Sequence, residues 1–259
     1  MRRETVAAET SDDAVLGGRL LLTQPRRGHR VGHDAILLAA VTPAKAGEHA
    51  VDLGAGVGAA GLALATLVDG LSVTLVEIDA ALAKLAAANI RRNDLGARVR
   101  AVALDAAAPG RAFAAAGLPA GTAARVLMNP PFNDPRERQV SPDPARRRAH
   151  VAAPDGLAAW VRNAERLLAP RGTLTLIWRA DRLADVLAAL ARRFGAVTVL
   201  PVHSRPAAPA IRVLVRAVKA SRAPLVLLPG FVLADAGGRP TAEADAVLRH
   251  GAALPLADA

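Results

Sequence analysis

From residue 49 onward the chain alternates short apolar runs with helical segments, and this alternation constrains the fold more than any other feature. Four apolar runs predict strands over residues 50–53, 72–78, 99–104 and 125–128. Between them, helices are expected over residues 59–68, 80–92 and, more weakly, 111–116. Such spacing is typical of βαβ units, which build a mostly parallel sheet with helices against it.

The second half of the chain continues this pattern and then changes it. We expect helices over residues 156–168 and 181–194 and strands over residues 173–178, 197–202 and 211–218. The last two strands are joined by a short proline-containing loop that leaves no room for a crossover helix. They should therefore pair antiparallel with each other.

The two ends of the chain flank this core. Residues 17–24 suggest a hairpin arm, and residues 34–41 suggest a helix stopped by Pro43. The tail carries a strand-like run at 225–228, a turn at Gly237-Gly238 and a short helix at 241–249. We expect a single domain over residues 1–259, with an extension (1–46), a catalytic core (47–218) and a C-terminal appendage (219–259).

Composition narrows the classes of protein that remain. The 259 residues are 52% hydrophobic and include no cysteine, which excludes disulfides, thiolate catalysis and Cys-ligated zinc and fits a reducing compartment. The start at Met1 is polar and acidic rather than apolar, and no apolar run reaches 18 residues. We therefore expect a cytoplasmic protein without a signal peptide, a membrane span or a metal.

The formal net charge is +10, from 33 Lys and Arg against 23 Asp and Glu. A strong positive balance favours a polyanionic partner such as a nucleic acid. Lysine is rare while alanine and arginine are abundant, so a GC-rich coding sequence is the alternative explanation.

A glycine-rich loop follows the first strand of the alternating region. Gly54 and Gly56 allow a tight turn and the close approach of a ligand to bare backbone. Glu77 ends the next strand, 21 residues beyond Gly56, where a carboxylate can accept hydrogen bonds from both hydroxyls of a ribose. Alone, the pattern suits a dinucleotide or another nucleoside cofactor, or a loop that only packs a helix onto a strand. Asp79, two residues later, is equally suited to capping the next helix.

A second motif, Asn129-Pro130-Pro131-Phe132, directly follows the strand predicted at 125–128. Two prolines end the strand abruptly and remove backbone donors, so carbonyl acceptors dominate there. The Asn129 side-chain carbonyl and the Pro130 backbone carbonyl can accept from the hydrogens of an exocyclic amine, and Phe132 can stack on a base. The alternative is a turn with a core phenylalanine.

These motifs, in this order, resemble those of the tRNA adenine-N6 methyltransferase family. Its members carry Q-P-x-x-G-[YH]-R-x-x-x-D-A-x-L-L, D-[LI]-G-x-G-x-G and N-P-P-[YF], matched here from Gln24 to Leu38, from Asp52 to Gly58 and from Asn129 to Phe132. The resemblance implies an α/β fold of the class I methyltransferase type: a Rossmann-like, seven-stranded mixed sheet with an antiparallel last strand and helices on both faces. It also implies S-adenosyl-L-methionine as the cofactor.

The resemblance assigns roles residue by residue. Asp52 would lie near the methionine moiety of the cofactor, Asp105 would accept from its adenine amine, and Arg30 and Asp34 would line its pocket. The implied cofactor-binding residues are Arg30, Asp34, Asp52, Gly54, Gly56, Glu77, Asp105 and Asn129. The implied catalytic residues are Asn129, Pro130, Pro131 and Phe132.

A basic segment follows Phe132 and contains Arg136, Arg138, Arg146, Arg147 and Arg148. These arginines could hold RNA phosphates, or they could form an ordinary solvated loop.

The leading hypothesis is a methyltransferase that acts on an exocyclic base amine in RNA, most specifically adenine N6 in tRNA. Methylation of guanine N2 in ribosomal RNA and of a glutamine amide in a protein use similar motifs. A nicotinamide-dependent oxidoreductase would leave Asn129 to Phe132 unexplained. A non-catalytic RNA-binding module would not need Glu77 together with the glycine loop.

Overall fold

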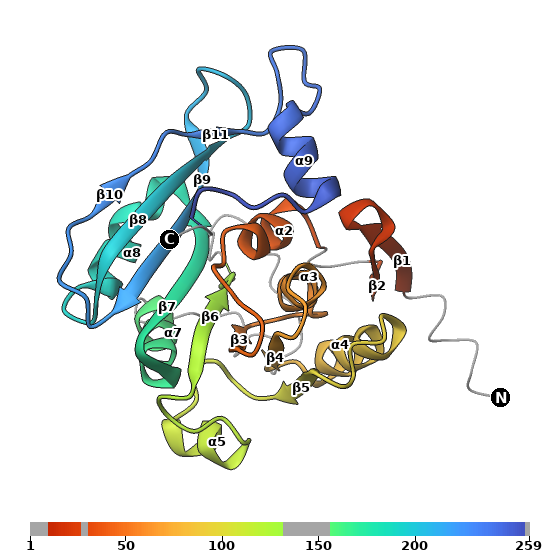
Figure 1. Cartoon of the computed structure of the whole chain (residues 1–259), viewed down its shortest axis with the longest axis vertical. Helices are drawn as coiled ribbons and strands as arrows, with labels where there is room; N and C mark the ends of the chain where they lie inside the picture. Colours follow the sequence, from red (N-terminus) through yellow and green to blue (C-terminus); the bar gives the residue numbers. More distant parts are fainter. Residues whose placement is uncertain (1–9, 27–30, 132–155, 257–259) are drawn as a thin grey trace, which may run out of the picture.

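The computed structural model describes residues 10–26, 31–131 and 156–256, and its centre is a nine-stranded mixed sheet (Figure 1). The strand order is β10-β8-β9-β7-β6-β3-β4-β5, and β11 pairs with β8 beyond the end of its pairing with β10. A separate two-stranded hairpin precedes the sheet.

Five parallel strands form one half of the sheet. They are β3 (His49–Leu53), β4 (Ser72–Glu77), β5 (Val99–Ala103), β6 (Ala123–Met128) and β7 (Leu168–Arg179). The chain runs outward from β3 through β4 to β5 and then returns to the other side of β3 as β6. The order therefore reverses between β3 and β6, and in open α/β sheets ligands bind at the carboxyl ends of the strands at such a point.

The two strands after β7 pair as the sequence predicts. β8 (Phe194–His203) and β9 (Ala210–Lys219) are antiparallel to each other, and β9 is also antiparallel to β7. The predicted sheet of seven strands with an antiparallel last strand is thus confirmed for β3 to β9. The short strands β10 (Val226–Leu227) and β11 (Phe231–Val232) add to its outer edge, in parallel to β8.

Helices cover both faces of the sheet, as predicted. One hydrophobic core contains residues from α2 (His33–Ala40), α3 (Ala59–Leu67), α4 (Ala80–Arg92) and α9 (Ala242–His250). The opposite core contains residues from α5 (Gly110–Ala115), α7 (Gly156–Leu167) and α8 (Leu183–Leu190). Successive residues of a strand point to opposite faces of the sheet. In β4, Leu75 therefore packs into the core with α2 and α3, and Val76 packs into the core with α7 and α8.

The first strands form a hairpin that packs against α4. β1 (Thr10–Val15) pairs antiparallel with β2 (Leu20–Pro25) around the short 3-10 turn η1 (Leu16–Gly18). The predicted arm at 17–24 corresponds to the turn and β2, whereas β1 was not predicted. Its TSDDAV sequence is polar, and only its partner β2 carries the fully buried leucines Leu20 and Leu22.

The helix predicted over residues 181–194 is shorter than expected. A 3-10 turn, η2 (Ala180–Arg182), precedes α8, and α8 ends at Leu190. Arg192 then adopts φ 67°, and Phe194 begins β8. A continued helix would have cost the antiparallel pairing of Phe194 with Lys219, so sheet pairing overrides the helical propensity of this segment. In the described part of the chain, no helix has both the length and the apolar character of a membrane span.

Candidate active site at the switch between β3 and β6

The glycine loop between β3 and α3 presents bare backbone at the carboxyl edge of the sheet. Gly54, Gly56 and Gly58 have φ of 73°, 58° and 92°, a left-handed region that disfavours side chains. The N–H groups of Gly54 and Ala55 donate to the Val76 carbonyl at 2.8 and 2.9 Å, which ties the loop to the end of β4. At Gly56 an added Cβ would meet no atom within 4 Å. The backbone there is open to a ligand.

Glu77 closes the loop from the neighbouring strand. Its two carboxylate oxygens accept from the backbone N–H groups of Gly56 at 2.7 Å and Asp79 at 2.9 Å. The side chain is largely buried. Each oxygen keeps a further acceptor direction, because a carboxylate offers about four lone-pair sites. The predicted pair of glycine loop and distal acid is therefore brought together, while its role toward a ribose stays a prediction.

Asp52 lies beneath the loop and is 2% exposed. Its Oδ2 accepts the N–H of Gly61 at 2.8 Å, so the strand residue caps the first turn of α3. Burial raises the pKa of Asp52 to about 7, the Gly61 hydrogen bond opposes that rise, and the nearby Glu77 charge adds to it. The position near a cofactor's methionine moiety stays a prediction, while the structure adds a capping role that the sequence did not predict.

Asp79 and Asp105 end adjacent strands and differ in role. Asp79 is the N-cap of α4 and accepts from the N–H groups of Ala81 and Leu82. Asp105 is exposed just beyond β5, and its Oδ1 accepts from the Ala107 N–H at 2.8 Å. Asp105 therefore remains open to a ligand, whereas Asp79 serves the helix.

Asp34 stands in the first turn of α2 and pairs with an arginine from the far end of the sequence. Its Oδ2 lies 3.0 Å from Nε of Arg212, near the start of β9. Because β9 runs antiparallel, its beginning lies at the same edge as the ends of the parallel strands. Arg212 therefore belongs to the surroundings of the predicted cofactor pocket, although no sequence signal pointed to it. Arg30 lies outside the described residues.

The proline motif directly borders the glycine loop. Met128 pairs with Leu53 in the β3–β6 ladder, so Asn129 and Gly54 each follow the last paired residue of adjacent strands. Asn129 is half-buried, Pro130 buried and Pro131 exposed. Phe132 and the predicted phosphate-binding arginines lie outside the described residues. These are Arg136, Arg138, Arg146, Arg147 and Arg148.

Trp160 on α7 is a contact that the sequence did not predict. Its indole ring packs directly against the α-carbon of Gly54, where an added Cβ would stand 2.4 Å from a ring atom. Gly54 is thus constrained twice, by its positive φ and by the ring. Trp160 fixes the loop from the side of the sheet opposite α3.

Two asparagines at the C-terminal end of α4 hold the N-terminal hairpin beside the loop: Asn89 lies in the helix and Asn93 is its C-cap. Asn89 is fully buried, accepts from the Thr23 N–H, and donates to the carbonyls of Thr23 and Val57. Asn93, one turn later, accepts from and donates to the backbone of Leu21. Together they pair with β2 as a neighbouring strand would, and Asn89 also reaches the glycine loop at Val57.

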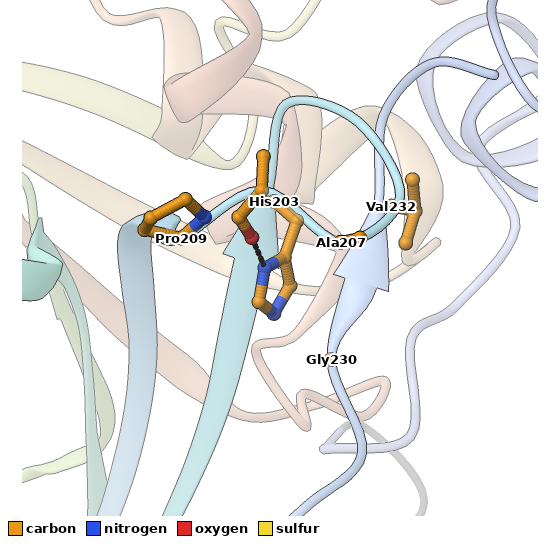
Figure 2. A pocket seen from close by; sticks show the side chains of 6 residues that line it. His203, Ala207, Pro209, Gly230 and Val232 are labelled. Atoms are coloured by element: carbon orange, nitrogen blue, oxygen red, sulfur yellow. Dashed lines mark hydrogen bonds between the residues drawn. The ribbon is translucent and has the colours of Figure 1, made fainter. Parts of the chain in front are cut away.

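A separate hollow of 440 Å³ lies at the β8–β9 connection (Figure 2). Figure 2 shows His203 within it, its Nδ1 2.7 Å from the Ala208 carbonyl, while the rest of the ring packs against Gly230. Strands β9 and β7 separate β8 from β6. The hollow is thus distinct from the site at Gly54 and Asn129. Among the described residues, no group of three or more metal-ligating side chains occurs.

Comparison with known proteins agrees with this geometry. Residues 29–205 match the family model of the methyltransferase small domain. A curated protein of Tolumonas auensis, named tRNA1(Val) (adenine(37)-N6)-methyltransferase, is 30% identical over 175 residues, which are 67% of this chain and 69% of that protein. A Bacteroides fragilis protein of the same name is 40% identical over 76 residues, 32% of its length.

A solved structure of an Agrobacterium tumefaciens protein, described as a predicted O-methyltransferase, is also similar. It superposes with a TM-score of 0.72 at 30% identity, over 85% of this chain and 98% of that one. The match of 29–205 alone covers more than half of the chain. The chain therefore belongs to the methyltransferase small domain family, among the class I methyltransferases that use S-adenosyl-L-methionine.

Proposed function

We propose that this methyltransferase transfers the methyl group to the exocyclic N6 of adenine in a tRNA. The observation that carries the proposal is the junction of Asn129 with the glycine loop, one residue past the Leu53–Met128 pair. An amide carbonyl and a proline carbonyl would stand where a methyl donor held by the loop faces its acceptor. The name of the Tolumonas auensis relative and the net charge of +10 support tRNA as the substrate.

The residues of the glycine loop suit the cofactor. Glu77 would accept from the ribose hydroxyls, Asp105 would accept from the adenine amine, and the bare backbone at Gly56 would let the cofactor approach. Asp52 would lie near its methionine moiety, and Arg30 and Asp34 would line its pocket. The cofactor supplies a methyl group already activated by a positively charged sulfur, so the protein needs no strong base to begin the transfer.

The acceptor side would act by positioning. An adenine amine is a poor nucleophile because its lone pair is delocalised into the ring. The Asn129 side-chain carbonyl and the Pro130 carbonyl would accept its two hydrogens and favour a pyramidal nitrogen with a localised lone pair. Phe132 would stack on the base, a contact worth roughly 1–3 kcal/mol. Holding nitrogen, methyl and sulfur in line is then the main catalytic contribution.

The acceptor base has to leave its stack before it can reach Asn129. Extruding a base from a duplex costs a few kcal/mol, and the cost is smallest for a nucleotide that is already single-stranded. A loop nucleotide of a tRNA is thus a cheaper target than a paired one. We further propose one domain, with residues 47–218 as the catalytic core.

The test is to incubate the protein with labelled S-adenosyl-L-methionine and total RNA from a strain that lacks the enzyme, and then to digest separated RNA classes to nucleosides. Label in N6-methyladenosine from tRNA is the expected result. Label in N2-methylguanosine from ribosomal RNA would replace the proposal with the guanine reaction. Label on a ribose oxygen would follow the description of the Agrobacterium protein, and label only in protein would indicate an amide acceptor.

A further inference from the structure

A second basic surface lies at the amino edge of the sheet, opposite the proposed site. Residues 168–172, 191–196 and 218–223 form the ends and connections of β7, β8 and β9 at this edge. They contain five cations and no Asp or Glu. We call this set the amino-edge cluster: Arg171, Arg192, Arg193, Lys219 and Arg222.

Hydrogen bonds hold the segments of this cluster together. The Ala220 N–H donates to the Arg193 carbonyl and the Ala196 N–H to the Ala223 carbonyl, both at 2.9 Å. The Lys219 ammonium donates to the Leu168 carbonyl at 2.7 Å. The backbone that carries these charges is therefore held in place by hydrogen bonds between the three segments.

One carboxylate forms ion pairs with two of the five cations. Glu165 on α7 lies 3.7 Å from Arg193 and 3.8 Å from Lys219. The other three cations, Arg171, Arg192 and Arg222, are exposed. Counting Glu165, the cluster keeps a formal charge of +4 at neutral pH, as five cations and one anion. Such a local excess favours a polyanion.

Positive φ angles at non-glycine residues concentrate at this edge. Seven non-glycine residues of the described chain have positive φ, and four lie in these segments: Arg171, Arg192, Ala196 and Ala220. Glycine would adopt these angles at a lower cost, and the same segments contain glycine at other positions, Gly172 and Gly195. At Arg171 and Arg192 the positive φ costs conformational energy that glycine would not incur.

The distance between the two edges suggests the form of the ligand. β8 spans ten residues, about 33 Å at roughly 3.3 Å per residue. B-form DNA rises about 3.4 Å per base pair, and an A-form RNA duplex rises less, so an RNA stem needs more than roughly ten base pairs to cover this distance. A short single-stranded loop at Asn129 cannot reach the amino edge, whereas a loop on a long helical stem can.

We propose that the amino-edge cluster binds the phosphates of a helical RNA stem whose loop is presented at the opposite edge. The inference rests on the proposed RNA substrate and adds to it the requirement for a helical stem of more than about ten base pairs. Arginine and lysine side chains there contact phosphate oxygens, so they add affinity and orient the stem without reading its sequence.

The test compares two synthetic RNAs that share one adenine-containing loop, one on a stem of about twelve base pairs and one on a stem of about four. Binding of each RNA is measured against salt concentration for the wild type and for a triple variant, Arg171→Gln, Arg192→Gln and Arg222→Gln. The control triple variant, Arg91→Gln, Arg239→Gln and Arg249→Gln, removes the same charge from exposed positions on α4, the β11–α9 loop and α9. Cofactor binding and thermal unfolding verify that each variant is folded.

For the long stem, the amino-edge variant should lower the slope of log affinity against log salt by about 2 to 3, near 1 for each lost phosphate contact. Its binding of the short stem should match the wild type, and the control variant should keep most of the long-stem slope. Equal losses on both stems, equal losses in both variants, or no loss overturn the proposal. Binding needs no methyl transfer. The stem-dependent loss of binding can therefore be observed whether or not the total-RNA assay finds N6-methyladenosine, so this proposal and the proposed function can fail separately.

Discussion

The Oδ2 of Asp52 accepts the N–H of Gly61 at 2.8 Å, which joins β3 to the first turn of α3 directly beneath the glycine loop. This close packing leaves no room for a side chain at Gly61. An added Cβ there would stand 3.0 Å from this oxygen and 2.3 Å from a methyl of Leu75. Burial away from water disfavours the charged form of a carboxylate, so the buried group binds its proton more tightly. Burial raises the pKa of Asp52 from 3.8 to about 7.

This raised pKa predicts a pH-dependent stability. The folded state binds the Asp52 proton more tightly than the unfolded state, so the stabilisation is present below about pH 4 and is lost as pH rises through about 7. At roughly 1.4 kcal/mol per pH unit, the full loss is about 4 kcal/mol. Asp52→Asn removes this titration. We expect the free energy of unfolding of the variant, relative to wild type, to improve by a few kcal/mol between pH 5 and pH 8, measured by urea denaturation. Parallel curves would show that Asp52 titrates normally.

Substitution of Glu77 should weaken the binding of the cofactor. Glu77→Gln replaces one acceptor oxygen with an amide NH₂ that faces either the Gly56 or the Asp79 N–H, so one of these donors loses its partner. The amide NH₂ also cannot accept from a ribose hydroxyl. A hydrogen bond to a charged group contributes roughly 1.5–3 kcal/mol, so losing this bond to the cofactor should lower the affinity for S-adenosyl-L-methionine about 10- to 100-fold by calorimetry. Asp79→Asn is the control, since Asp79 caps α4, and it should change cofactor affinity little. Unchanged binding by the Glu77 variant would remove Glu77 from the cofactor site.

Gly54 and Trp160 should be energetically coupled. Gly54→Ala adds a methyl at φ 73° and against the indole ring, which we expect to cost a few kcal/mol of stability. Trp160→Leu removes the ring, so the double variant should lose less than the sum of the single losses, by about 1 kcal/mol or more. Urea denaturation of the four proteins gives this coupling. Strict additivity would mean that backbone strain alone requires glycine.

The two asparagines of α4 should differ in their contribution to stability. Asn89→Ala leaves the Thr23 N–H and the Val57 carbonyl without their buried partner, at a cost of roughly 1–3 kcal/mol for each buried group. Asn93→Ala removes similar bonds at the exposed side of α4, where water replaces them. The loss in unfolding free energy should therefore be clearly larger for Asn89. Equal losses would mean that the hairpin contact, rather than burial, sets the energy.

Contacts that follow from the order of the strands along the chain could be predicted from the sequence. Gly56 and Glu77 meet because consecutive parallel strands end at one edge, and Asn129 meets Gly54 because β6 returns beside β3. The Trp160 contact depends on how a later helix packs, and the Asp34–Arg212 pair joins residues 178 positions apart. Neither leaves a local pattern in the sequence. Asn89 is polar and yet fully buried, and only the docked hairpin explains its burial.

Asn129 separates catalysis from cofactor binding. Asn129→Ala removes the proposed acceptor for the amine but leaves the glycine loop and Glu77 intact, so methyl transfer should be abolished while cofactor affinity stays nearly unchanged. Asn129→Asp keeps an acceptor oxygen and should retain more activity than the alanine variant. Single-turnover transfer to the RNA and calorimetry of cofactor binding measure the two effects. Because Asn129 is half-buried next to the loop, thermal unfolding accompanies both assays. A folded alanine variant that loses cofactor binding and transfer in equal proportion would show that Asn129 holds the cofactor rather than the acceptor.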